Sequence, residues 1–381
     1  MTRSRSEILW WWLLLGVAAL GTPAGGQASE GGSEVAVRAM TFNVRYGSAD
    51  DGANRWELRR ELVFETLREH GADFIGLQEA LPFQIEEIAG VLPDHEVMYR
   101  TRRADPAEGE ACAIFFRGDR WHLDDRRQGT FWLSETPEEP GSRSWDSSLP
   151  RIATWGMFTH RETGARMFVF NTHFDHRGQV ARERSAELLR ERATAEADGE
   201  PLLVMGDFNA GETNPAITLL GKRSDDGPRL VDSFRLVRPE ATEVHTTNGW
   251  GLREEGDKID GIFVAEGAEV VDAAILRPRF DGRTPSDHDP VTVTLRLPLD
   301  RIAIEITDLG QCRSCAGGIL RALEGLEGVL RATLHPAEPR VLVTVPSGGG
   351  PSVEQLRDAV LRAGYAPGAI GPPVSPGRPD G

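Results

Sequence analysis

Residues 204–214 read VMGDFNAGETN, and the apolar residues Leu202 and Leu203 precede them. The run PLLVM has the composition of a buried strand, yet Gly206 ends it and Asp207 and Asn209 follow at once. Such a strand end is either an ordinary turn, which favours Asp and Asn, or the rim of a site for a metal and a phosphate.

Several other apolar runs end in, or are interrupted by, polar residues of the same kind. They are Asn43 in TFNVR, Gln78 and Glu79 in GLQEA, Asn171, His173, Asp175 and His176 in NTHFDH, Asp260 in KIDGIF, and Asp287, His288 and Asp289 in SDHDP. One such strand end is unremarkable, but their joint occurrence indicates a shared site. Asp175, His176 and Asp289 could instead be cap or turn residues, and we favour that interpretation for Asp289. We expect the isolated His160 and His245 to lie at the surface.

Hydrolysis of a phosphate ester requires neutralised phosphoryl oxygens, an aligned water and a protonated leaving oxygen. Mg²⁺ or Mn²⁺ prefers a few hard oxygen ligands, which Glu79 and Asp287 could supply. A further carboxylate near the phosphate can orient or deprotonate the water, and we assign this role to Asp207.

Neutral and cationic donors complete the predicted site. Asn43 and Asn209 can hydrogen-bond a phosphate without adding negative charge, and His173 and His288 can donate to its nonbridging oxygens. Asp260 is a candidate to orient His288. Separately, Arg151 after SWDSSLP is either a phosphate clamp, because its planar fork suits phosphate, or part of a structural salt bridge.

The chain has 381 residues, of which 39% are hydrophobic, so it can form a large globular domain and a smaller one. Up to about residue 297, short strands alternate with a few helices, which suits two packed sheets with helices outside. The predicted strands include 35–46, 74–80, 166–176, 201–209 and 258–265, and the predicted helices are 55–70 and 179–197.

These stretches, in this order, resemble the endonuclease/exonuclease/phosphatase superfamily, whose fold is DNase I-like. The resemblance covers residues 36–297, with LQE, GDFN and SDH as its most specific motifs. It implies an α+β fold, a four-layer αββα sandwich with the site at one end, and a Mg²⁺-dependent (or Mn²⁺-dependent) phosphoesterase. Some stretches also resemble a bacterial branch related to deadenylase-type members, although Arg45 stands where some nucleases carry an acid.

The resemblance also implies residue roles. The catalytic residues would be His173, Asp207, Asn209, Asp260 and His288, and the metal site would comprise Asn43, Glu79 and Asp287. Substrate specificity would reside in loops such as 101–110, 134–150 and 242–256.

After residues 297–300, which we interpret as a break, residues 301–370 have a βαββαβ pattern typical of a small ferredoxin-like domain. Cys312 and Cys315 lie in a loop that enters a helix, where two thiols can bind a soft ion. The segment resembles the heavy-metal-associated domain, which implies Cu⁺ or a related soft cation at Cys312 and Cys315. A disulfide between them, or a module without metal, is the alternative.

The N-terminal segment has the order of a secretory signal. Arg3 and Arg5 precede the apolar residues 8–20 and the small residues 21–29, and we expect cleavage after Ala28. The alternative is an uncleaved anchor, but this apolar run is short beside the ~20 residues that span a bilayer. The mature protein would then be periplasmic or extracellular, without a transmembrane domain, with a linker at 29–35 and a disordered tail at 371–381.

The formal net charge of −16 argues against a nonspecific nucleic-acid binder, which needs a basic surface. The sequence therefore predicts an exported, monomeric phosphodiesterase of the nuclease type, forming no stable nucleic-acid complex, whose substrate is a nucleotide, nucleic acid or lipid headgroup. A phosphomonoesterase acting on sugar or inositol phosphates is one alternative. A metal-handling protein with a non-catalytic phosphoesterase domain is the other.

Overall fold

The computed structural model describes residues 34–223, 228–309, 316–335, 338–346 and 348–373. Several predictions concern residues outside these ranges. They are the signal segment 1–28, most of the linker 29–35, the pair Cys312 and Cys315, and most of the tail 371–381.

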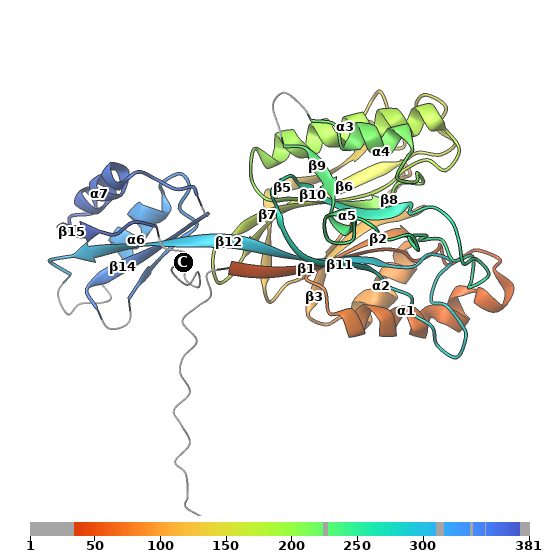
Figure 1. Cartoon of the computed structure of the whole chain (residues 1–381), viewed down its shortest axis with the longest axis horizontal. Coiled ribbons are helices and arrows are strands. Elements are labelled where there is room, and N and C mark those ends of the chain that lie inside the picture. Colours follow the sequence, from red (N-terminus) through yellow and green to blue (C-terminus); the bar gives the residue numbers. More distant parts are fainter. Residues whose placement is uncertain (1–33, 224–227, 310–315, 336–337, 347, 374–381) are drawn as a thin grey trace, which may run out of the picture. The chain divides into compact units, whose positions relative to one another are not determined.

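Among the described residues, strands form two sheets, and nine strands belong to the first sheet (Figure 1). In spatial order they are β13 (Arg331–Leu334), β14 (Arg340–Pro346), β12 (Val291–Ile306), β1 (Glu34–Asn43), β2 (Phe74–Ala80), β4 (Ala111–Arg117) and β3 (His95–Met98), while β11 (Glu269–Ile275) and β15 (Pro367–Ile370) also pair with β12. Strand β1 is parallel to β2 and antiparallel to β12.

The second sheet has six strands among the described residues. Their spatial order is β5 (Trp121–Trp132), β6 (Ile152–His160), β7 (Arg166–His173), β8 (Leu202–Asp207), β10 (Asp260–Ala265) and β9 (Leu230–Asp232). Strands β7 and β8 are parallel, whereas β10 is antiparallel to β8.

The two sheets pack face to face, and helices cover their outer faces (Figure 1). Helices α1 (Trp56–His70) and α2 (Pro82–Val91) share a core with the first sheet, and α3 (Gln179–Ala197) and α4 (Pro215–Leu220) share one with the second. The short elements are η1 (Gly52–Asn54) and α5 (Ser233–Val237). The predicted sandwich of sheets is therefore confirmed.

Hydrophobic periodicity explains the layers. In β1, Val35, Val37 and Ala39 face the core between the sheets, whereas Met40 and Phe42 belong to the core beneath α1 and α2. Helix α3 coincides with its predicted range, and α1 ends where Gly71 adopts a left-handed conformation with φ of 53°.

The C-terminal segment has its own hydrophobic core. From the end of β12 onward the order is helix α6 (Gly317–Glu324), β13, β14, helix α7 (Val353–Arg362) and β15. The predicted capping box of Ser352 and Gln355 is present at the start of α7. Residues 297–300, expected as a break, instead lie within the continuous strand β12, which changes its pairing partner there from β1 to β14.

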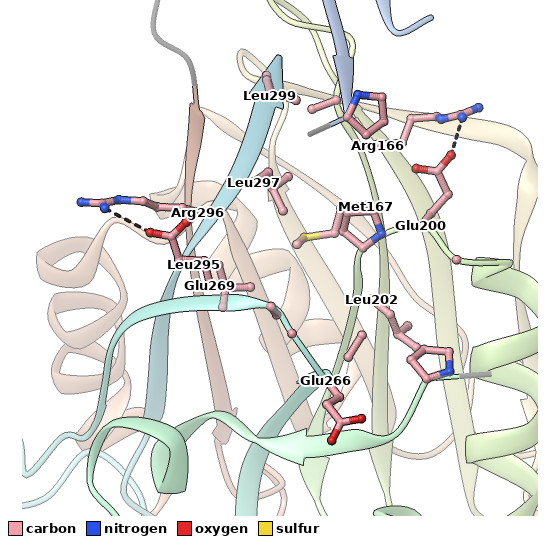
Figure 2. Close-up of a pocket in the computed structure, with 18 of the residues that line it drawn as sticks. Arg166, Met167, Glu200, Leu202, Glu266, Glu269, Leu295, Arg296, Leu297 and Leu299 are labelled. Atoms are coloured by element: carbon pink, nitrogen blue, oxygen red, sulfur yellow. Dashed lines mark hydrogen bonds and ion pairs between the residues drawn. The ribbon is translucent and has the colours of Figure 1, made fainter. Parts of the chain in front are cut away.

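An apolar cavity of about 410 Å³ adjoins the first residues of β7 and β8 and the middle of β12 (Figure 2). Met167, Leu202, Leu295 and Leu297 contribute to its lining. Ion pairs between Arg166 and Glu200 and between Arg296 and Glu269 join further lining residues. The predicted site residues lie at the opposite ends of β7 and β8. Among the described residues, no helix is long and apolar enough to cross a membrane.

Candidate active site

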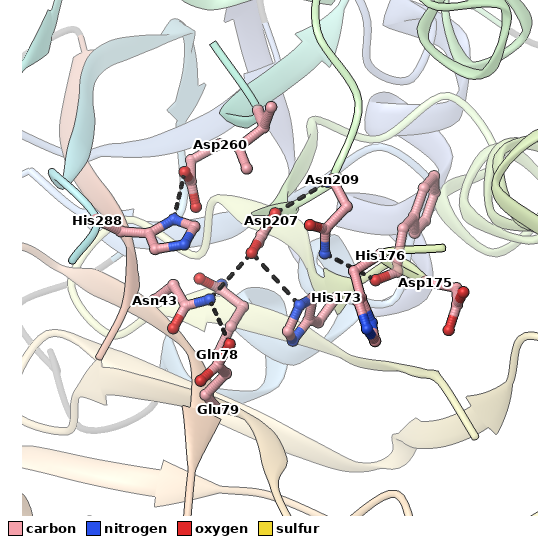
Figure 3. A network of polar contacts seen from close by, with 12 residues as sticks. Asn43, Gln78, Glu79, His173, Asp175, His176, Asp207, Asn209, Asp260 and His288 are labelled. Carbon is pink, nitrogen blue, oxygen red and sulfur yellow. Dashed lines mark hydrogen bonds and ion pairs between the residues drawn. The ribbon is translucent and has the colours of Figure 1, made fainter. Parts of the chain in front are cut away.

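Strand direction brings the predicted site residues to one edge of the sandwich. Asn43, His173 and Asp207 are the last residues of β1, β7 and β8. Asp260 begins β10, which runs in the opposite direction and pairs Asp260 with Asp207. His288 precedes β12, which is antiparallel to β1. Figure 3 shows the resulting network.

Asp207 is the centre of this network. Its Oδ2 accepts a hydrogen bond from Asn43 Nδ2 at 2.9 Å and lies 3.3 Å from His173 Nε2. Its Oδ1 accepts from the backbone N–H of Asn209 at 2.9 Å. The carboxylate is buried, with a relative exposure of 1%. Asp207 therefore has a fixed orientation, as a base that must align one water requires.

His288 and Asp260 form the predicted pair. His288 Nδ1 lies 2.8 Å from Asp260 Oδ2. Burial disfavours the imidazolium, but the charge and hydrogen bond of Asp260, together with Asp207, raise the pKa of His288 well above its ordinary value. His288 is therefore held as a cation that can donate to a phosphoryl oxygen.

His173 has the opposite electrostatic setting. Burial and then the nearby cations Arg151 and Arg102 lower the pKa of His173 well below its ordinary value. The imidazole is thus kept neutral beside Asp207. A neutral His173 can still donate one hydrogen bond to a nonbridging oxygen.

Glu79 lies beside Asn43, as the predicted metal site requires. Its Oε1 accepts from Asn43 Nδ2 at 3.1 Å and its Oε2 accepts from the backbone N–H of Tyr46 at 3.1 Å. Arg45 Nη1 is 4.0 Å from Glu79 Oε2, so an arginine stands beside this carboxylate. The pKa of Arg45 is raised, chiefly by its hydrogen bond to Asp51, with contributions from Asp287 and Glu79.

The donor set fits a hard divalent cation. Carboxylate oxygens of Asp207 and Asp260 lie within 4.8 Å of each other, whereas His288, held as a cation, would not be a ligand. Asp260 Oδ1 is buried without a hydrogen-bond partner among the described residues. Glu79 and Asn43 offer further oxygen atoms nearby, through their contacts with each other and with Asp207. A cation at this edge would compensate carboxylates that are otherwise crowded together.

Backbone strain accompanies these positions. Arg45, Glu79 and Asn209 have φ values of 57°, 62° and 47°, in the left-handed region that side chains other than glycine rarely adopt. The side-chain amide of Asn209 donates to the carbonyl of Phe174 at 3.0 Å, which fixes its orientation beside Asp207. Residues with rarely populated backbone φ and ψ angles cluster at active sites in proteins.

Two further predicted residues lie near this network. Asp287 is half-buried, accepts from Ser286 Oγ at 3.3 Å and acts electrostatically on Arg45 and Arg59. Arg151 is 4% exposed, and its Nη2 lies 3.1 Å from His176 Nδ1. Asp175 in turn accepts hydrogen bonds from the loop at Ser148 and from the residues that precede α3, such as Gly178.

Three expectations about individual residues were wrong. His160 is buried, at 7% exposure, because it packs against Trp121. His245 is also buried, at 8% exposure, and it lies near Asp289. Asp289 is more than a turn residue, since Arg277 and Arg279 form ion pairs with it at 2.6 and 3.1 Å.

The sequence analysis also missed polar residues around the site. Arg102 is buried and donates to Glu110 at 2.5 Å, and both belong to the loop that was expected to carry specificity. Asn171 was identified only as a strand-end residue. It joins the two sheets, donating from β7 to the carbonyls of Leu77 in β2 and Ala113 in β4.

The carboxyl of Asp207 should make the stability of the metal-free protein depend on pH. Burial, and then the charge of Asp260, raise the pKa of Asp207 from 3.8 to about 7. The folded state therefore binds the Asp207 proton more tightly than the unfolded state does. The stabilisation from this bound proton is lost as pH rises through about 7. Relative to wild type, Asp207→Asn should become more stable between about pH 5 and about pH 8. Thermal unfolding in EDTA measures this difference, and a constant difference across the range would contradict it.

Comparison with known proteins agrees with this geometry. The family model for the endonuclease/exonuclease/phosphatase family matches residues 40–288. The structure of a mannosyl-6-phosphatase from Bacteroides thetaiotaomicron is 31% identical, with a TM-score of 0.61, and the match covers 68% of this chain and 99% of that chain.

Two curated relatives extend the comparison. The uncharacterized protein L388 of Acanthamoeba polyphaga mimivirus is 24% identical over 252 residues, which are 63% of this chain and 91% of that protein. The 3'-5'-exoribonuclease subunit Ccr4 of Aspergillus clavatus is 31% identical over 147 residues, which are 34% of this chain and 21% of Ccr4. The chain thus matches only about a fifth of the length of Ccr4. The motifs, the two-sheet sandwich and the family match together show that this chain belongs to the endonuclease/exonuclease/phosphatase family.

Proposed function

We propose that this protein hydrolyses phosphoesters with the help of a divalent cation, Mg²⁺ or Mn²⁺. Members of its family are metal-dependent hydrolases of phosphoester bonds. The observation that carries the proposal is the placement of Asp207 between Asn43 and His173, with the Asp260–His288 pair alongside.

In the proposed reaction, Asp207 orients a water and accepts its proton while the water oxygen bonds to phosphorus. The bond from phosphorus to the ester oxygen breaks, the phosphoryl group remains on the attacking oxygen, and the departing ester oxygen takes up a proton from solvent water. His288, held as a cation by Asp260, and His173 donate to nonbridging oxygens. Glu79 and Asn43, with help from Asp287, would hold the cation, which supplies charge neutralisation at the phosphate when bound.

The substrate is either a phosphodiester or a phosphomonoester. The sequence favoured a diester, and the similarity to Ccr4, described as an exoribonuclease, supports that candidate. The similarity to a mannosyl-6-phosphatase over nearly the whole of that protein supports a monoester. The net charge of −16 favours small substrates over long nucleic acids in both cases.

We also propose that the protein is exported and that its C-terminal segment is a ferredoxin-like, soft-metal-binding module. The order of β12, α6, β13, β14, α7 and β15 supports the fold of this module. Binding of Cu⁺ by Cys312 and Cys315, against a disulfide, remains a proposal from the sequence.

Phosphorus NMR with a mixed panel of phosphomonoesters and phosphodiesters tests the catalytic proposal. Turnover should require Mg²⁺ or Mn²⁺ and stop in EDTA, because the phosphoryl charge is otherwise uncompensated. Glu79→Gln should also weaken Mn²⁺ binding, measured by calorimetry, by about tenfold or more, since one anionic ligand is lost. Glu269→Gln is the matched control, because Glu269 pairs with Arg296 at the surface. Metal-independent turnover, or unchanged Mn²⁺ binding by Glu79→Gln, would contradict the proposal.

A further inference from the structure

A small cavity adjoins His173 beside the catalytic network. Its lining includes Arg102, Glu110, Arg151 and the imidazole of His173, and apolar residues close the remaining sides. The cavity has a volume of about 10 Å³. That is roughly the space that one water molecule or one oxygen atom occupies.

Two buried arginines supply unused donors at this cavity. Arg102 and Arg151 are 8% and 4% exposed. Nε of Arg102, and Nε and Nη1 of Arg151, are buried and have no hydrogen-bond partner among the described residues. Buried guanidinium N–H groups without an acceptor are costly, so this arrangement suits an acceptor that arrives from outside.

Existing partners of the two arginines leave these donors free. Arg102 uses Nη2 for Glu110, and Arg151 uses Nη2 for His176. Asp175 Oδ2 lies 3.7 Å from Arg151 Nε, beyond hydrogen-bond distance, and accepts instead from the backbone N–H and hydroxyl of Ser148. Glu110 and Asp175 thus compensate the charge of the pair without satisfying its N–H groups.

The cavity is electrostatically continuous with the catalytic site. Both arginines contribute to the low pKa of His173, and Glu79 acts on Arg102. An oxygen in the cavity would therefore be near the neutral imidazole of His173, which lines it. In the proposed reaction His173 donates to a nonbridging oxygen, so a bound phosphate would place that oxygen in this neighbourhood.

Resting on the proposed function, we infer that the Arg102–Arg151 cavity receives a nonbridging phosphate oxygen and makes the enzyme selective for phosphomonoesters of small molecules. The proposed cation and His288 engage two nonbridging oxygens, so the cavity takes the third oxygen that does not leave. This oxygen is unesterified and charged in a monoester but carries a carbon substituent in a diester. A cavity of about 10 Å³ accepts the oxygen but not the substituent. The guanidinium groups favour the more highly charged oxygen, because hydrogen bonds between charged groups are stronger than neutral ones.

Hydrolysis of p-nitrophenyl phosphate and bis(p-nitrophenyl) phosphate, which share a leaving group, tests the inference. With Mg²⁺, wild type should prefer the monoester. Arg102→Gln should lower kcat/KM for the monoester by about tenfold to hundredfold, as expected for lost hydrogen bonds to a charged group, and change diester hydrolysis far less. Arg151→Lys, which keeps the charge but loses the fork, should act in the same direction. Arg184→Gln on the exposed face of α3 is the matched control.

The outcomes separate the two proposals. If wild type hydrolyses neither compound nor any member of the NMR panel, the proposed function fails. If it hydrolyses diesters as well as monoesters, or if both arginine variants lower the two activities equally, the function stands and the inference is overturned.

Calorimetry on Mg²⁺-loaded wild type provides a test that requires no variant to fold. Inorganic phosphate should bind at least about tenfold more tightly than dimethyl phosphate, because a lost hydrogen bond to a charged group is worth about that much. Equal affinity would overturn the inference.

Discussion

Asp207→Asn is expected to lower kcat/KM for phosphoester hydrolysis by about 10²- to 10⁴-fold, the range for loss of a positioned general base. The amide has nearly the same shape, but it cannot accept the proton of the attacking water. Its neighbours should remain in place, because Asn43 also donates to Glu79 and His173 is buried. We expect the loss in kcat, with KM unchanged or lower, since a negative charge near the phosphate disappears.

Steady-state kinetics on the best substrate of the NMR panel, with saturating Mg²⁺, measures this effect. Asp272→Asn is the matched control, because Asp272, in β11, forms an exposed ion pair with Arg238. Circular dichroism should show that both variants are folded. A loss smaller than about tenfold would mean that Asp207 is not the base.

Asn171→Ala is expected to lower the free energy of unfolding by about 3 kcal/mol, because two buried carbonyls lose their side-chain donor and Gln78 Nε2 loses one of its three acceptors. Asn171 donates to the carbonyls of Leu77 and Ala113 at 2.9 and 2.8 Å, and its Oδ1 accepts from Gln78 at 2.6 Å. The regular pairing of β2 with β4 is interrupted after Leu77, which leaves these carbonyls to a side chain. Asn171 is completely buried, so bulk solvent does not contact these groups.

Urea unfolding at equilibrium measures the change. Asn214→Ala provides a matched control, because Asn214 caps the short helix α4 at its first turn, and losing such a cap costs about 1 kcal/mol. If Asn171→Ala were no more destabilising than Asn214→Ala, the bridge between the sheets would contribute little to stability.

Much of the site could be predicted because its information is local. Asp207, His173 and Asn43 end apolar strands, and parallel strands bring such ends together. The pairing of Asp260 with His288 was also predicted, from the chemistry that an imidazole needs. Both α1 and α3 were predicted, α1 from apolar residues at helical spacing and from Gly71 as its stop, and in the structure each helix buries one periodic face.

Other features depend on contacts that no short pattern encodes. Arg102 reaches the site from a loop whose sequence, RTRRADPAEGE, resembles an ordinary charged surface. Asp289 sits in the same motif as His288, yet its partners Arg277 and Arg279 lie in a separate irregular stretch. The continuity of β12 could not be read from residues 297–300 because the change of pairing partner leaves no break in the strand.

The left-handed backbone at Glu79 has a consequence for how this sequence can change. Glycine would relieve the conformation at φ of 62°, but it would remove the carboxylate that contacts Asn43 and Tyr46. Selection for stability alone would therefore replace this glutamate, whereas selection for chemistry keeps it. The conformation at Glu79 is held where the parallel β1–β2 register ends, one residue after the pair Asn43 and Gln78, so this position sets backbone strain against a carboxylate at the site.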